Sequence, residues 1–130
     1  MRGLAILAVM AGPVFAQAIP VPQAVPQDQI WPQQIRLALG ECWNVGALTP
    51  DAMRATATLR VTFDPTGRPE ASSISLSSFT GEVEAAEQLF GSARRAILRC
   101  GRQGYDLPAD RYALWKVMEL TFDPAGLSLR

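Results

Sequence analysis

The strongest constraint on the fold is a run of apolar residues at helical spacing in the second half of the chain. The run recurs at alternating intervals of three and four residues, and its members are Val83, Ala86, Phe90, Ala93, Ile97 and Cys100. This spacing places them on one face of an α-helix. Arg99 lies in the last turn, where a positive charge complements the helix dipole, and Gly101 is suited to end the helix. The pattern predicts one long amphipathic helix.

Two shorter segments before this helix alternate apolar and polar residues, as half-buried strands do. The first covers residues 55–64, in which Leu59 and Phe63 share one parity. Residues 64–67, Asp-Pro-Thr-Gly, are typical of a turn, because proline presets φ and glycine accepts a positive φ. The second strand is expected over roughly 69–78. Together the two segments predict a β-hairpin with one apolar face.

The remaining elements are a first helix and a last strand. The helix is predicted to begin near Pro32, since proline suits the first helical turn, and to end near residues 44–46, where a glycine can cap it. A third strand is predicted over 112–123 and is stopped by Pro124.

The predicted element order is therefore helix, strand, strand, helix, strand. A strand–helix–strand crossover leaves the second and third strands parallel and is right-handed. The third strand then lies beside the first. The predicted fold class is α+β, with a three-stranded antiparallel-type sheet in order 2-1-3, helices packed on one face, and strands two and three at the edges.

Residues 1–18 have the features of a secretory signal peptide. Arg2 gives a positive start, an apolar run follows, and a Gly-Pro pair ends that run. Cleavage after Ala16 and cleavage after Ala18 both fit the small-residue pattern. The rival interpretation is a membrane anchor, but a spanning helix needs about 20 apolar residues and this run stops well short of that length. We predict export, with no membrane insertion after signal cleavage.

Residues 19–29 are rich in proline and glutamine and are predicted to form an extended leader. Residues 30–130 then form the one predicted domain. The chain has two cysteines, Cys42 and Cys100. In an exported protein an even cysteine count favours a disulfide, and only one intramolecular pairing exists here. The alternative is two small buried residues that never meet.

Composition argues against several classes of function. Twelve Lys and Arg residues balance twelve Asp and Glu residues, and no long basic run occurs, so the footprint of a nucleic-acid binder is missing. The chain contains no histidine, which removes the usual general base and the commonest metal ligand. Two distant cysteines do not make a zinc site. We predict a protein that is not an enzyme and that binds no cofactor, metal or nucleic acid.

Several polar and aromatic clusters have structural explanations. A serine cluster lacks an activating base, so a solvated strand edge explains it better than a nucleophile. Its members are Ser72, Ser73, Ser75, Ser77 and Ser78. Acidic residues at the start of the long helix complement its dipole, and these are Glu82, Glu84 and Glu87. The glycine-rich segment 101–104 follows a helix, so it offers no helix N-terminus to a phosphate. Core or near-core packing is predicted for the aromatic residues Trp43, Tyr112 and Trp115.

An exposed edge strand is the remaining candidate site. Such an edge carries unpaired N–H and C=O groups and can accept a strand from a partner. The segment from Trp115 to Thr121 is long, regular and β-prone, and its Lys116 and Glu119 discourage promiscuous pairing. The alternative is a plain structural edge that binds nothing.

A set of short segments, in order over about residues 29–124, carries a family resemblance. The segments are Gln34-Ile35-Arg36, Cys42-Trp43-Asn44, residues 59–67 (Leu-Arg-Val-Thr-Phe-Asp-Pro-Thr-Gly), Ser77-Ser78, residues 93–100 (Ala-Arg-Arg-Ala-Ile-Leu-Arg-Cys), Leu107-Pro108, residues 112–116 (Tyr-Ala-Leu-Trp-Lys) and residues 119–124 (Glu-Leu-Thr-Phe-Asp-Pro). Together they resemble the C-terminal domain of TolA. The related TonB C-terminal domain shares the architecture but fits these segments less well.

The resemblance implies a noncatalytic docking module of the Tol–Pal system in the periplasm of a Gram-negative envelope. In that family the domain meets TolB, and colicins and filamentous phage coat protein exploit it. Partners add a strand to the edge of the last strand. By resemblance that edge is Trp115, Lys116, Val117, Met118, Glu119, Leu120, Thr121 and Phe122. The family pattern also pairs Cys42 with Cys100.

The N-terminal region departs from the family. TolA has a membrane anchor and a long helical stalk, whereas this chain has a signal-like segment and a Pro/Gln leader. Binding therefore carries over from the family more readily than energy transduction. The alternative function is a TonB-like adaptor that engages peptides of outer-membrane transporters.

Overall fold

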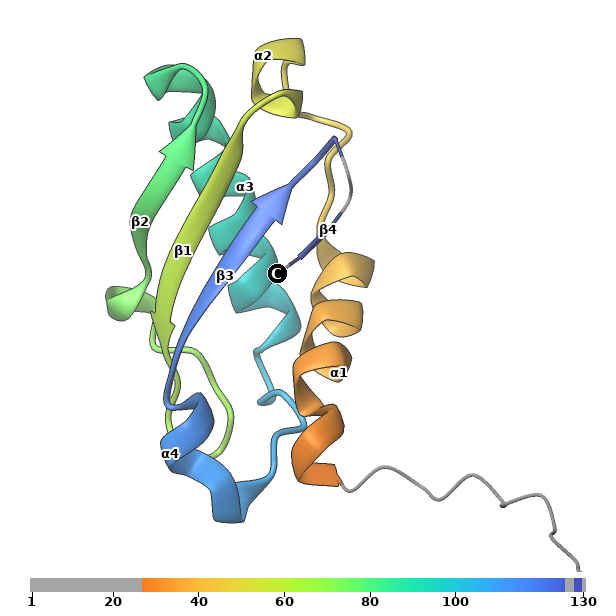
Figure 1. The fold of residues 1–130 in the computed structure, drawn as a ribbon, viewed down its shortest axis with the longest axis vertical. Coiled ribbons are helices and arrows are strands. Elements are labelled where there is room, and N and C mark those ends of the chain that lie inside the picture. The colour runs from red at the N-terminus through yellow and green to blue at the C-terminus, as the bar shows by residue number, and fades with distance from the viewer. Residues whose placement is uncertain (1–26, 126–127, 130) are drawn as a thin grey trace, which may run out of the picture.

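The computed structural model describes residues 27–125 and 128–129 and shows an α+β fold. In this part of the chain the strands form one sheet in the order β2-β1-β3-β4, with antiparallel neighbours throughout. The strands are β1 (Thr56–Thr62), β2 (Ser75–Thr80), β3 (Val117–Asp123) and β4 (Ser128–Leu129). The two long helices are α1 (Gln27–Cys42) and α3 (Val83–Cys100), and both lie on one face of the sheet (Figure 1). The short helical segments are α2 (Pro50–Met53), α4 (Tyr112–Trp115) and the 3-10 turns Ala71–Ser73 and Ala109–Arg111.

The predicted fold class is confirmed, because β1 lies between β2 and β3 and helices pack against one face of these strands. The short strand β4 is an addition that the sequence did not reveal. The predicted signal peptide, residues 1–18, and residues 19–26 of the predicted leader lie outside the described residues. Among the helices that the structure describes, none is both long enough and apolar enough to span a bilayer.

The core is built on the alternation of β1. Ala57, Leu59 and Val61 are buried on the face that the helices cover, and the residues between them are more exposed. Leu59 lies opposite Leu120 of β3, so the apolar row continues across the sheet. Burying one such side chain fully stabilises a fold by roughly 1.5–3 kcal/mol.

The long helix exists as predicted, but its buried face is rotated from the predicted stripe. Ala86, Ala93 and Ile97 are buried as expected, whereas Val83 is 58% exposed. Leu89 is fully buried instead. The other buried residues of this face are Ala85, Ser92 and Ala96. Small side chains let a helix backbone approach the sheet closely, so packing favoured the alanine-rich face over the face with larger residues.

The start of α1 differs from the prediction. The helix begins at Gln27, and Pro32 lies inside it, so the predicted start near Pro32 is wrong, as is the predicted extended conformation of residues 27–29. A proline inside a helix removes one backbone hydrogen bond. The earlier start of the helix packs Trp31 against the hydrophobic core. This packing offsets the loss of the backbone hydrogen bond at Pro32.

The second strand is shorter than predicted and starts later. Pro69 forms only an isolated bridge with Phe63, and the chain then leaves the ladder as a 3-10 turn before β2 begins at Ser75. In this gap the Ser73 hydroxyl takes the place of a strand backbone, because it accepts a hydrogen bond from the Thr62 N–H at 2.9 Å. A register shift between Thr58 and Leu59 interrupts the β1–β2 pairing further along.

The predicted turn after β1 is confirmed by a hydrogen bond from the Gly67 N–H to the Asp64 carbonyl oxygen at 2.9 Å. The Asp64 carboxylate accepts a hydrogen bond from the Thr66 hydroxyl at 2.6 Å, and this bond is the main cause that lowers the pKa of Asp64 below its ordinary value of 3.8. Gly67 has φ of +85°, and a Cβ atom there would lie 2.4 Å from the Tyr105 carbonyl oxygen. Only glycine fits this crossing of two loops.

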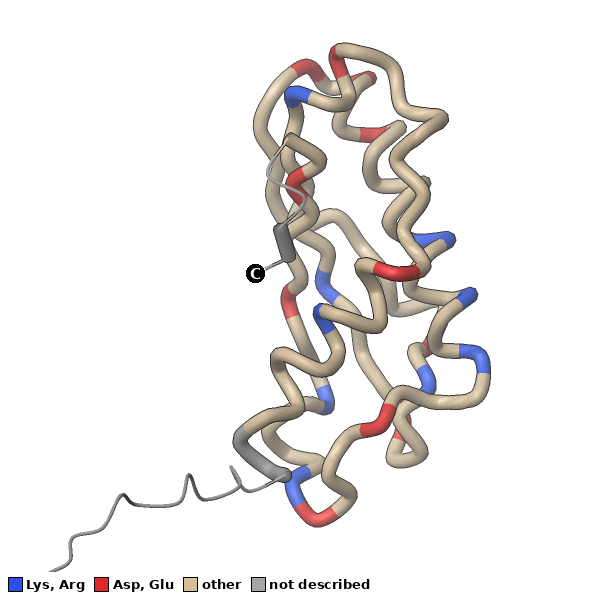
Figure 2. The backbone as a smooth tube through the Cα atoms, turned by 90° about the vertical axis from the view of Figure 1, so that its right-hand side faces the viewer, with Lys and Arg blue, Asp and Glu red and all other residues tan. Residues whose placement is uncertain are grey.

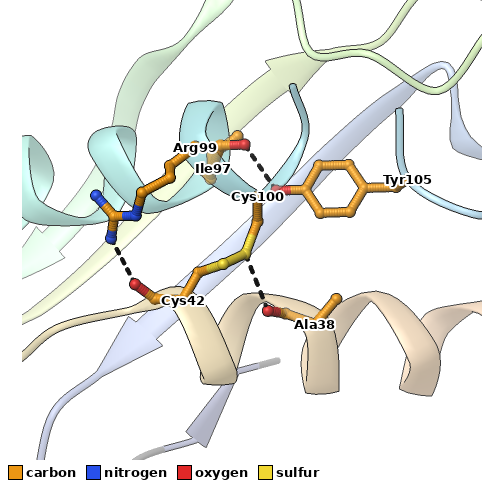
Figure 3. Close-up of a disulfide and its surroundings, with 6 residues drawn as sticks. All are labelled: Ala38, Cys42, Ile97, Arg99, Cys100 and Tyr105. Atoms are coloured by element: carbon orange, nitrogen blue, oxygen red, sulfur yellow. Dashed lines mark hydrogen bonds between the residues drawn. A yellow bond between two sulfur atoms is a disulfide. The ribbon is translucent and has the colours of Figure 1, made fainter. Parts of the chain in front are cut away.

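The predicted disulfide is confirmed and joins the ends of the two long helices. Cys42 and Cys100 are bonded, with their Cα atoms 6.0 Å apart. Arg99 donates a hydrogen bond to the Cys42 carbonyl oxygen at 2.5 Å, which caps the last turn of α1 beside the bridge (Figure 3). A disulfide of this kind is typical of a protein that folds in an oxidising compartment.

Candidate functional site

The predicted edge segment, residues 115–122, is divided between a helix and a strand. Trp115 ends α4, and Lys116 keeps a helical conformation with φ of −52° and ψ of −41°. The prediction that residues 112–116, among them Trp115 and Lys116 of the predicted edge, belong to the last strand is therefore wrong. The cause is packing, because the Trp115 ring is buried and its Nε1–H donates to the Pro108 carbonyl oxygen at 2.8 Å. The strand begins only at Val117.

The direction of the backbone N–H and C=O groups in β3 decides which of them can pair with an added strand. The Lys116 carbonyl oxygen accepts a hydrogen bond from the Phe63 N–H at 2.8 Å, so it points toward β1. Backbone groups alternate sides along an antiparallel strand. Val117, Glu119 and Thr121 therefore direct their N–H and C=O groups away from β1. We call these backbone groups the free edge.

Strand β4 limits the free edge at one end. It pairs with β3 through Phe122 opposite Leu129 and Asp123 opposite Ser128. The prediction that the third strand is an edge along its whole length is therefore wrong at this end. A partner strand that leaves β4 in place meets only the first five residues of β3, which contain the free edge.

A groove of about 150 Å³ lies beside the free edge, between β3 and the first turns of α1. Its lining residues are Trp31, Pro32, Ile35, Arg36, Met118, Glu119 and Leu120. Trp31 and Ile35 make its helix wall apolar, and Met118 and Leu120 come from the buried face of β3. This contribution of α1 was not predicted from the sequence, where an aromatic residue, Trp31, in a polar segment is the signal for it.

The opposite face of the sheet is polar, and none of the helices in the described part of the chain covers it. Thr58 of β1 and Thr121 of β3 share a hydrogen bond between their hydroxyl groups at 2.8 Å. Arg60 lies opposite Glu119 in the register, with both side chains exposed. Charged residues of both signs are interspersed along the described backbone (Figure 2). Side chains on this face contact solvent and pair across the strands, whereas the apolar groove lies on the face that the helices cover.

The other edge of the sheet, β2, is a poorer platform for strand addition. It carries most of the predicted serine cluster, and Ser72, Ser75, Ser77 and Ser78 are exposed, which agrees with the predicted solvated edge. The register shift in its pairing with β1 distorts this edge, and such irregularities discourage further pairing. Phe79 is 42% exposed here, and it is not among the residues that line the groove at β3.

The predicted aromatic residues take part in packing, as expected. Trp43 directly follows α1, and its Nε1–H donates to the hydroxyl of Ser92 in α3 at 3.1 Å, in a buried contact. The Tyr112 hydroxyl donates to the Phe63 carbonyl oxygen at 2.7 Å. These bonds satisfy the polar atoms of both aromatic side chains, which agrees with the predicted role in packing.

The structure places the predicted acidic cluster at the start of α3. Glu82, Glu84 and Glu87 are exposed at the start of α3. Within the described part of the chain, His, Cys, Asp and Glu side chains form no group that could hold a metal ion. Comparison with known proteins found no family model, no curated protein and no solved structure that matches this chain.

Proposed function

We propose that the chain is a noncatalytic protein-binding module of the Gram-negative periplasm, and that it accepts an extended strand of its partner at the free edge of β3. The observation that carries the proposal is the set of outward backbone groups at Val117, Glu119 and Thr121, beside an apolar groove. Main-chain hydrogen bonds to such an edge give affinity, and a neighbouring pocket gives specificity.

The proposed partner is TolB of the Tol–Pal system, on the strength of the resemblance in sequence. Colicins and filamentous phage coat protein are the further proposed ligands of the same edge. The disulfide supports a location outside the reducing cytoplasm. The absence of histidine from the whole sequence supports a role without acid–base catalysis.

The added strand has a defined geometry in this proposal. Each of the three outward residues can exchange an N–H and a C=O bond with an antiparallel partner. A hydrogen bond contributes about 0.5–1.5 kcal/mol net in such an exchange. Side chains of the added strand that point to the helix side enter the groove beside Trp31 and Ile35.

We expect Glu119→Pro to weaken TolB binding about tenfold or more, since it removes the central N–H of the free edge and places a ring against the added strand. Position 119 is preferable to position 117, because proline at 117 would disfavour the helical conformation of Lys116. Titration calorimetry of the purified exported protein with TolB measures the dissociation constant.

Phe79→Pro is the matched control, because it places the same residue type on the opposite edge of the sheet. It should leave the dissociation constant within about twofold, a difference of about 0.4 kcal/mol. Equal loss in both folded variants would contradict binding at β3. Failure of the folded wild type to bind TolB, together with binding of a TonB-box peptide at β3, would move the proposal to the TonB-like adaptor.

A further inference from the structure

A second pocket lies between α3 and the turn that follows α1. It has a volume of about 290 Å³ and shares no lining residue with the groove beside the free edge. On the loop side its wall comes from a turn in which the Leu48 N–H donates to the Val45 carbonyl oxygen at 3.1 Å. The polar residues that line it are Asn44, Gln88, Ser92, Arg95 and Arg99. We call it the arginine pocket.

Each side-chain oxygen of these residues already takes part in a hydrogen bond. The Gln88 Oε1 atom accepts from the N–H and from the hydroxyl of Thr49, both at 3.0 Å. The Asn44 Oδ1 atom accepts from the Gly46 N–H at 2.9 Å. The Ser92 hydroxyl accepts an indole N–H and donates to the Asn44 carbonyl oxygen at 3.4 Å. A backbone N–H can only donate, so these bonds fix both amide orientations, and each amide keeps its NH₂ group as a donor.

Arg95 has no partner that neutralises its charge among the residues that the structure describes. No described carboxylate pairs with it, and its helical neighbours four residues away are Gly91 and Arg99. A Cβ atom at Gly91 would lie 3.4 Å from the Arg95 Nη1 atom, so the guanidinium lies close over this glycine. Like charges four residues apart destabilise a helix. Arg95 also precedes the last turn of α3, so the helix dipole does not account for it.

Arg99, the other arginine of the pocket, is held beside the disulfide. It donates a hydrogen bond to the Cys42 carbonyl oxygen (Figure 3). A guanidinium has further N–H donors in a planar fork, and this fork matches the two oxygens of a carboxylate. The pocket therefore combines two positive charges with uncommitted N–H donors from two arginines and two amides.

We propose that the arginine pocket is a second docking site, which binds one carboxylate of a partner protein. A carboxylate is negatively charged and only accepts hydrogen bonds, so it complements both the charge and the donors of the pocket. It comes either from an Asp or Glu side chain or from the C-terminus of the partner. This docking does not depend on strand addition at the free edge.

A neighbouring hollow disfavours ligands that carry many negative charges. Asp51, Glu82 and Glu84 line this hollow, and Gln88 lines both the hollow and the arginine pocket. At physiological ionic strength, charges are only partly screened from one another within about 8 Å. A nucleic-acid backbone or an anionic lipid surface over the pocket would also bring phosphates against these carboxylates. A single carboxylate avoids this repulsion.

The test is an NMR titration of the ¹⁵N-labelled exported protein with two small carboxylates. N-acetylglutamate α-amide presents a side-chain carboxylate, and N-acetylglycine presents a C-terminal one. We expect both to shift the side-chain N–H signals of Asn44, Gln88, Arg95 and Arg99, and the lower dissociation constant identifies the source. The neutral N-acetylglutamine α-amide, and sodium chloride at equal ionic strength, should not produce these shifts.

Arg95→Gln should weaken binding of the tighter carboxylate about tenfold, because it removes a charge-assisted contact. Arg95 is exposed, so the variant should fold normally. Arg94→Gln is the matched control, since it removes the same charge from the adjacent residue, which donates to the Ala71 carbonyl oxygen and does not line the pocket. It should change the dissociation constant by less than about twofold.

Three results would overturn the inference. The first is the absence of shifts at these four side chains with about 50 mM of either carboxylate. The second is equal weakening by Arg95→Gln and Arg94→Gln, which would show an effect of net charge alone. The third is tighter binding of inorganic phosphate or of vesicles that contain phosphatidylglycerol. Glu119→Pro lies outside the pocket and should leave the titration unchanged, so failure of this inference and failure of the proposed function are distinguishable.

Discussion

Replacing Cys42 and Cys100 together by serine is expected to lower the free energy of unfolding by about 4 kcal/mol. The bridge closes a loop between residues 58 apart in sequence, so its loss frees a long segment of the unfolded chain. It also releases the end of α1 from the end of α3, where the bridge joins the two helices. For a domain of this size, 4 kcal/mol corresponds to a fall in Tm of about 15–30 °C.

Denaturant unfolding of the wild type and the double variant measures the difference. Reduction of the wild type by a thiol reagent is the control, and it should reproduce the stability of the double variant. A loss below about 1 kcal/mol would be too small for the removal of a loop-closing bridge and would contradict the pairing of Cys42 with Cys100 in the exported protein.

Trp115→Ala is expected to destabilise the fold by about 3–5 kcal/mol, because it leaves a large cavity. The Trp115 side chain is only 1% exposed, and its ring packs edge-on against Tyr112 with centroids 4.8 Å apart. The substitution also removes the donor to the Pro108 carbonyl oxygen. Chemical denaturation followed by circular dichroism gives the free energy.

Leu114→Ala is the matched control on the same helical turn. Leu114 is 61% exposed, so its truncation should change stability by less than about 0.5 kcal/mol. A loss of stability below about 0.5 kcal/mol for both variants would mean that Trp115 lies on the open face of the sheet with the parity of Val117. That outcome would restore the strand predicted from sequence in place of α4.

The layers of the fold were predictable because they depend on periodicity. The alternation of Leu59, Val61 and Phe63 and the helical spacing near Ile97 determine which faces are apolar, and those faces can be buried in few ways. The boundaries were less predictable, because packing decided them. Pro32 lies inside α1 since Trp31 gains contact with the core, and Ser73 replaces a strand residue beside Thr62 through its hydroxyl group.

The candidate site was predictable in part. The parity of Met118, Leu120 and Phe122 indicated which side chains of the last strand are buried, and the structure agrees. Sequence pattern could not show that Trp115 turns inward, because a single buried tryptophan can end a helical turn or begin a strand. Nor could it show the groove, since its two walls come from segments far apart in the sequence that meet only in the fold. It could not show β4 either, because a strand of two residues is too short to have an alternating pattern.

The central claim is that a partner adds a strand at β3, and intermolecular NOEs test it most directly. The ¹⁵N-labelled chain is mixed with unlabelled TolB, and contacts from TolB to the amide protons of the chain are recorded. The account predicts NOEs at Val117, Glu119 and Thr121, and none at Phe79 of β2. A complex whose NOEs fall on β2 or on the helices, with none at those three amides, would contradict the claim.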